Sequence, residues 1–155
     1  MLLRRSFAMR AEAYAHMFDV LRERFGTEQA LDIAMEATRR MGTRMGAKLA
    51  HHGPSDLAGL RDAFLGGIID REGMFAPEVR RCDAQELEIK FHRCPLKEAW
   101  DDAGRSPEDV QLLCRMAGAI DRGLFEAAGF TFAGETWKPG ETGCCRLRVL
   151  PGEKP

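Results

Sequence analysis

The sequence lacks any long hydrophobic run and any strong excess of charge. No stretch approaches the roughly 20 consecutive apolar residues that a transmembrane helix needs, although 45% of the 155 residues are hydrophobic. The formal net charge of -1 gives no global attraction to nucleic acid or to an anionic membrane surface. We therefore expect neither a nucleic-acid nor a membrane partner. The partner is expected to be a small molecule or another protein.

The common signatures of cofactor and metal sites are also missing. The sequence has no CxxC pair, HExxH motif, glycine-rich phosphate loop or GxSxG elbow. Arginines stand near the N-terminus where a signal peptide has its apolar core, so we expect a cytoplasmic protein. The five cysteines are an odd number without regular spacing, which favours thiols over disulfides. The length predicts a single domain over 1–155.

About residues 5–70 show the periodicity of amphipathic helices, in which apolar residues recur every three or four positions. A first stripe covers 7–25 and ends at Gly26, after which Thr27 is expected to cap a second helix. The two apolar stripes could pack against the protein's own sheet or against a second subunit, so a homo-oligomer is one expected arrangement.

Small residues and helix breakers mark the rest of this helical part. Gly42 and Gly46 reduce helix propensity but allow the second helix to pack closely against a neighbour. After the breaker at 51–54, Ser55 is expected to cap a short helix. The paired histidines of that breaker have no cysteine or histidine nearby at metal-ligand spacing, which favours capping of a helix C-terminus over a metal site.

Residues from about 76 to 150 favour a small antiparallel sheet packed with one long helix. Alternation of apolar and polar residues predicts a strand at 87–91, with which an earlier strand at about 79–82 is expected to pair. Two further strands are expected at 130–137 and 144–150, and 96–104 is expected to form a short helix or a turn. Ser106, followed by proline and two acids, predicts a long helix that runs to about Ala128. Helices followed by an antiparallel sheet are typical of an α+β domain.

The long helix carries a carboxylate on its apolar face. Asp121 lies on the same stripe as Cys114, two turns further along. A buried carboxylate either finds hydrogen-bond donors or has a raised pKa, and either state can serve as a general acid or base. An aspartate that pairs with an arginine for purely architectural reasons fits the pattern equally well.

Cys94 stands at the end of a predicted strand, a position that often borders a pocket. It shares its strand parity with His92, and a thiol near an imidazole has a lowered pKa and is a better nucleophile or metal ligand. Ordinary surface alternation predicts the same parity. We expect no cofactor. The alternative is a zinc ion held by His92, Cys94, Cys114 and a C-terminal cysteine.

Two adjacent thiols begin the last predicted strand. Strand parity groups Cys145 with the apolar residues and Cys144 with Arg146 and Arg148, so Cys145 is the expected inward thiol. Either arginine could bind a substrate carboxylate through two parallel hydrogen bonds, although paired arginines on a terminal strand also fit a solvated face.

Four segments, taken in their order and spacing, resemble a known family. They are FGTEQA (25–30), FHRCPLKEAW (91–100), LLCRMAGAID (112–121) and GETGCCRLRV (140–149). They resemble the L-2-amino-thiazoline-4-carboxylic acid hydrolase family over most of the chain. The C-terminal layout is also similar to four-vinyl-reductase-type domains, whose sheet and helices enclose a small-molecule pocket. In the last segment the glycine-acid spacing favours Cys144 as the matching residue, whereas the following apolar residues favour Cys145.

The resemblance implies a hydrolase that opens a 2-aminothiazoline ring to an N-carbamoyl cysteine. It implies Cys94 as nucleophile, Asp121 or His92 as acid and base, and Arg146 or Arg148 as carboxylate anchor, with Cys114 and one of Cys144 and Cys145 in the same pocket. The alternative function is a non-catalytic sensor domain that binds a small molecule or a metal.

Overall fold

The computed structural model describes residues 1–154 and has an α+β fold, which confirms the predicted class. The helices are α1 (Leu2–Phe25), α2 (Thr27–Gly46), the 3-10 helix η1 (Ala47–His52), α3 (Leu57–Gly66), α4 (Arg71–Met74), α5 (Pro95–Asp102) and α6 (Pro107–Ala127). The strands are β1 (Pro77–Cys82), β2 (Leu87–Phe91), β3 (Thr131–Phe132) and β4 (Arg146–Leu150). They form an antiparallel sheet in the order β1-β2-β4-β3.

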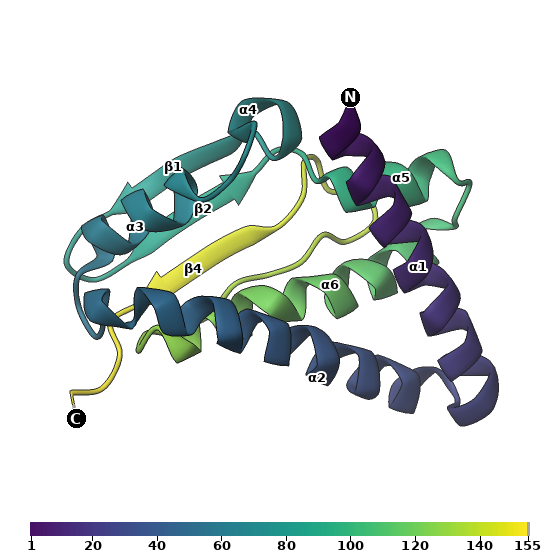
Figure 1. Cartoon of the computed structure of the whole chain (residues 1–155), viewed down its shortest axis with the longest axis horizontal. Helices are drawn as coiled ribbons and strands as arrows, with labels where there is room; N and C mark the ends of the chain where they lie inside the picture. The colour runs from purple at the N-terminus through teal and green to yellow at the C-terminus, as the bar shows by residue number, and fades with distance from the viewer. Residues whose placement is uncertain (155) are drawn as a thin grey trace.

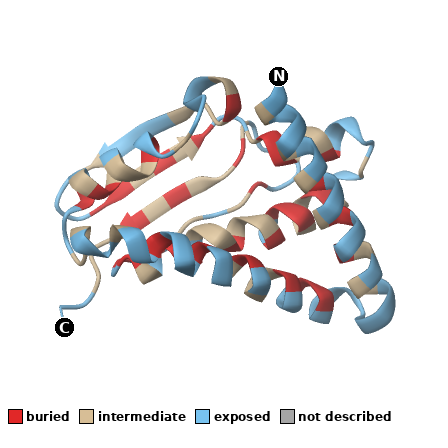
Figure 2. Ribbon diagram, viewed as in Figure 1, coloured by how far each residue is buried: buried red, intermediate tan, exposed pale blue. Residues whose placement is uncertain are grey.

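The sheet and the helices form separate layers with the core between them. Figure 1 shows α2 and α6 side by side below β4, with α1 crossing near α5 at the opposite end from the C-terminus. The inward side chains of β2 and β4 are buried, as the alternation predicted, and the buried residues of the helices gather on their inner sides (Figure 2). In the described part of the chain, no helix combines the length and the hydropathy needed to cross a membrane.

Three glycines allow α2 and α6 to pack with their backbones almost in contact. An added Cβ would lie 1.9 Å from the Ile120 carbonyl oxygen at Gly42 and 1.9 Å from that of Leu124 at Gly46. On α6, a Cβ at Gly123 would lie 2.0 Å from the Arg39 carbonyl oxygen. The close packing expected of Gly42 and Gly46 is therefore present, and it holds α6 in place beside the sheet.

Substitution of Gly42 by alanine is expected to destabilise the protein although alanine favours helix. The new methyl group would collide with backbone atoms, which cannot rotate away as a side chain can, and overpacking of this kind costs about 1–3 kcal/mol. Gly66→Ala is the matched control, because nothing lies within 4 Å of an added Cβ at that helical position. Urea unfolding followed by circular dichroism should show a lower midpoint for Gly42→Ala only. Equal midpoints for the two variants would contradict the packing argument.

Two predicted helix caps are wrong by one residue. Gly26, with φ of 80°, both ends α1 and precedes α2, so Thr27 is the first helical residue and not the cap. A glycine with positive φ lets one residue reverse the chain between two helices. The cap of α3 is Asp56 and not Ser55, because the Asp56 carboxylate accepts a hydrogen bond from the Gly59 amide at 2.9 Å.

The last two strands are shorter than predicted. Beyond β3, the chain keeps only an isolated bridge between Glu135 and Arg146, and the buried Trp137 donates its indole N–H to the Glu141 carbonyl oxygen. The predicted strand at 144–150 begins only at Arg146, so Cys144 and Cys145 lie in the segment before β4. Backbone hydrogen bonds join both cysteines to Phe91, the last residue of β2, at 2.8 and 2.9 Å.

Candidate functional site

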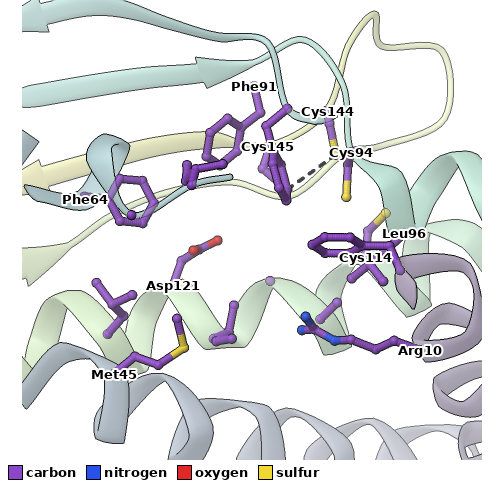
Figure 3. A pocket seen from close by; sticks show the side chains of 18 of the residues that line it. Arg10, Met45, Phe64, Phe91, Cys94, Leu96, Cys114, Asp121, Cys144 and Cys145 are labelled. Atoms are coloured by element: carbon purple, nitrogen blue, oxygen red, sulfur yellow. Dashed lines mark hydrogen bonds between the residues drawn. The ribbon is translucent and has the colours of Figure 1, made fainter. Parts of the chain in front are cut away.

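A cavity of about 310 Å³ lies between α1, α6, the segment around α3 and the ends of the central strands. This volume is at the lower end of the range for small-molecule sites. Most of its lining is aliphatic or aromatic (Figure 3). The apolar wall includes Leu3, Phe7, Phe64, Ile68, Ile69, Phe75, Phe91, Leu96, Trp100, Ile120 and Leu124.

Four of the five cysteines line this cavity, and they reach it from three different elements. Cys94 is the residue that precedes α5, Cys114 comes from α6, and the adjacent Cys144 and Cys145 come from the segment before β4. Figure 3 shows these side chains close to one another on one side of the cavity. The remaining cysteine, Cys82, ends β1 and is not part of the lining. Residues far apart in the sequence therefore form one thiol cluster.

Within the cluster, Cys144 is the most buried thiol, and each of the other three interacts with it. Its sulfur lies 3.7 Å from that of Cys145. Interaction with the thiol of Cys114 lowers the pKa of Cys144 most, and interaction with the thiols of Cys145 and Cys94 lowers it further. Interaction with Cys144 and desolvation raise the pKa of the other three thiols, Cys94, Cys114 and Cys145. The cluster can hold one thiolate with neighbours that donate to it.

Both adjacent cysteines line the cavity, so their location alone does not decide which of them acts in the site. Cys144 is the more buried of the two, at 2% exposed, whereas Cys145 is partly exposed. Strand parity does not distinguish them because this segment lies outside the ladder of β4. Cys145 faces the cavity as expected, but Cys144 faces it as well, so the two thiols are not divided between inside and outside.

Asp121 projects from α6 into the same cavity (Figure 3). No described residue donates a hydrogen bond to its carboxylate or forms an ion pair with it. Burial raises the pKa of Asp121 to about 7, with a smaller contribution from the negative charge of Cys144. Of the two outcomes that the sequence left open, the raised pKa is the one found here. A carboxyl group that titrates near neutral pH can both give and accept a proton under physiological conditions.

Three predicted site residues are not part of the cavity lining. The His92 imidazole lies 2.6 Å from the Glu78 carboxylate, Arg148 pairs with Glu86, and Arg146 lies 3.6 Å from carboxylate oxygens of two glutamates. Strand alternation explains why the two arginines lie outside the cavity. Leu147 and Val149 face the helices, so the residues between them face away. The structure therefore does not bring His92, Arg146 or Arg148 together with Asp121.

Sequence reasoning missed one charged residue of the cavity, Arg10. With Leu3 and Phe7 it forms an i, i+4, i+7 stripe on α1, which lines one wall of the cavity. The spacing was visible in the sequence. However, a single arginine beside apolar residues usually packs its aliphatic part against them and keeps its charge in water.

No three histidine, cysteine or acidic side chains within residues 1–154 are arranged so that they could hold a metal ion. The zinc alternative therefore has no geometric support here, and it stays a prediction that elemental analysis of the purified protein would test.

Comparison with known proteins identifies a family model and structurally similar proteins. A family model described as L-2-amino-thiazoline-4-carboxylic acid hydrolase matches residues 6–149. A trafficking protein particle complex subunit 3 from Naegleria fowleri, solved covalently bound to palmitic acid, has 13% sequence identity and a TM-score of 0.63, with 96% of each chain covered. At that identity the likeness shows the fold alone. The search of curated proteins found no match.

Proposed function

The chain belongs to the L-2-amino-thiazoline-4-carboxylic acid hydrolase family, and we propose that it hydrolyses a small cyclic amidine in the cavity between α1 and α6. The observation that carries this proposal is the meeting of four thiols and one carboxylate without a hydrogen-bond partner in a single apolar cavity. A nucleophile and a proton-transfer group with a pKa near neutrality are the two groups that such a hydrolysis needs.

The proposed reaction uses the thiolate of Cys144 as nucleophile. The sulfur adds to the ring carbon that lies between the nitrogen atoms and the ring sulfur, and the bond from that carbon to the ring sulfur then breaks. Protonated Asp121 gives its proton to the departing sulfur. Water next adds to the enzyme-bound carbon with Asp121 as base, and the Cys144 thiolate leaves. The net change is the addition of one water molecule, which for the family's name substrate gives an N-carbamoyl cysteine.

The neighbouring thiols support this assignment through their effect on Cys144. Interaction with Cys114, Cys145 and Cys94 lowers the pKa of Cys144 and outweighs the opposing effect of burial, while the apolar wall excludes water that would weaken these interactions. This reading assigns the nucleophile to Cys144 and not to Cys94, where the sequence motifs put it. Cys94 becomes a positioning residue that adjusts the charge of Cys144.

The direct test is turnover of L-2-amino-thiazoline-4-carboxylic acid by the purified full chain. The product should appear as a new N-carbamoyl thiol by mass spectrometry, and brief treatment with iodoacetamide should abolish the reaction. Substrate added before iodoacetamide should protect the protein. A Cys82→Ser variant should behave like the wild type, because Cys82 lies outside the cavity. Turnover that survives complete alkylation of Cys144 would overturn thiol catalysis.

A second candidate function is the binding of a fatty acyl chain as a cysteine thioester. The apolar lining and the partly exposed thiol of Cys145 favour it, and the structurally similar Naegleria fowleri protein is covalently bound to palmitic acid. In this case the thiolate would attack an acyl thioester donor and release the donor's thiol. Intact mass of the protein, purified without reducing agent, should then show an added acyl group that neutral hydroxylamine removes. A hydrolase would instead show its unmodified mass and turnover.

A further inference from the structure

Arg10 is the one basic side chain that lines the cavity among the described residues. Its Nε atom donates to the Tyr14 hydroxyl at 3.0 Å. No carboxylate among residues 1–154 lies within ion-pair distance of it. Arg22, further along the same helix, contrasts with it, because that guanidinium pairs with two aspartates. The end of the Arg10 guanidinium therefore keeps donors to offer.

Two aromatic rings and the packing of α1 hold Arg10 in this position. The carbon of its guanidinium lies 5.1 Å from the centre of the Tyr14 ring and 5.9 Å from that of Phe7. The helix itself is fixed against α5, since the Trp100 indole N–H donates to the Ala11 carbonyl oxygen at 2.8 Å. A cation that is restrained by stacking needs to lose less freedom when it binds an anion.

The charge of Arg10 is not balanced by the acidic group of the cavity. Asp121 forms no ion pair with it, and only burial and Cys144 affect the pKa of Asp121. Both side chains appear in Figure 3, where Arg10 enters from α1 and Asp121 from α6. An unpaired cation at the edge of an apolar space favours a ligand that brings its own negative charge.

We propose that Arg10 binds the carboxylate of the substrate and so selects acids whose remaining body is apolar. This inference rests on the proposed function, which needs a small-molecule substrate in this cavity. It replaces the role that the sequence gave to Arg146 or Arg148. The body of the acid would lie along the aromatic wall formed by Phe7, Phe64 and Phe75. The fork of a guanidinium matches both oxygens of a carboxylate, so the contact fixes orientation as well as charge.

The test compares ligands that differ only in the carboxylate. Calorimetric titration of the full chain would use L-2-amino-thiazoline-4-carboxylic acid against 2-aminothiazoline, and octanoate against octanol. The wild type should prefer each acid. Arg10→Gln should weaken binding of the acids by about 10- to 100-fold, with a change below about threefold for the neutral partners. Arg10→Lys should retain part of the preference, because it keeps the charge without the planar fork.

Arg40→Gln is the control, since Arg40 lies on α2 with its charge paired to Glu36 and does not line the cavity. It should bind all four ligands as the wild type does. Equal losses for acids and neutral partners in Arg10→Gln would assign Arg10 to helix packing and overturn the proposal. A wild type without preference for either acid would overturn it as well. Binding preference without turnover would instead refute the proposed hydrolysis and leave Arg10's role intact.

Discussion

Replacement of Cys144 by serine is expected to lower kcat/KM for a turned-over thiazoline by at least about 10³-fold, the scale of loss when a nucleophile is removed. Serine keeps the size of the side chain, but its hydroxyl does not ionise near neutral pH. The three thiols around it would then have no thiolate to stabilise. Steady-state kinetics at several pH values would measure the loss, and circular dichroism would show that the fold is unchanged.

Single substitutions of the neighbouring thiols separate a nucleophile from a positioning residue. Cys114→Ala should remove the strongest contribution that keeps the pKa of Cys144 low, because alanine has no donor, whereas serine would keep one. The pKa of Cys144 then rises, so the acid limb of the pH profile of kcat/KM should move to higher pH while activity at high pH recovers. Cys82→Ser should leave the profile unchanged. If Cys94→Ser abolishes activity at every pH and Cys144→Ser does not, the nucleophile is Cys94, as the sequence motifs favoured.

The elements that the sequence predicts well are those with local signals. Ser106 accepts a hydrogen bond from the Asp109 amide at the start of α6, as its position before proline and two acids indicated. The alternation in β2 gives its buried face directly. The caps of α2 and α3 are less well predicted, because a glycine with positive φ and an aspartate one residue later compete with the residues favoured by propensity alone.

The residues of the site can be predicted where helical phase determines which side chains face the cavity. They cannot be predicted where tertiary packing determines it. Phase placed Asp121 on the stripe of Cys114, and both line the cavity. Parity in the last strand placed Arg146 and Arg148 opposite the apolar residues, and they do face away from that cavity; the family resemblance, which made them carboxylate anchors, did not take this alternation into account. Arg10 escaped notice because its place in the cavity wall depends on how α1 packs against α5, which no local pattern encodes.

Asp121 also leads to the second large expected effect, which is a dependence of protein stability on pH. The pKa of Asp121 is raised from 3.8 to about 7 in the folded protein, so the folded state binds this proton more tightly than the unfolded chain does. Protonated Asp121 therefore contributes stability that is complete below about pH 4 and is lost as pH rises through about 7. The difference of about three pKa units corresponds to an upper limit of about 4 kcal/mol.

Asp121→Asn should remove this dependence, because the amide has similar shape and no charge at any pH. The variant is expected to be more stable than the wild type at pH 8 by about 2–4 kcal/mol, and nearly equal to it at pH 4. Urea unfolding at both pH values measures the difference, with Asp32→Asn on the exposed side of α2 as control. A wild type and an Asp121→Asn variant with the same pH dependence would show that Asp121 is solvated or paired in solution.

The kinetic consequence of this substitution distinguishes the role of Asp121 from a structural one. A stabilised but inactive protein is expected, since removal of a general acid and base typically costs about 10²- to 10⁴-fold in kcat. A substitution that raises stability and lowers activity identifies a residue that is costly to bury and is kept for its chemistry. An Asp121→Asn variant that gains stability at pH 8 and also retains full kcat would leave proton transfer to another group and would refute the reaction proposed for Asp121.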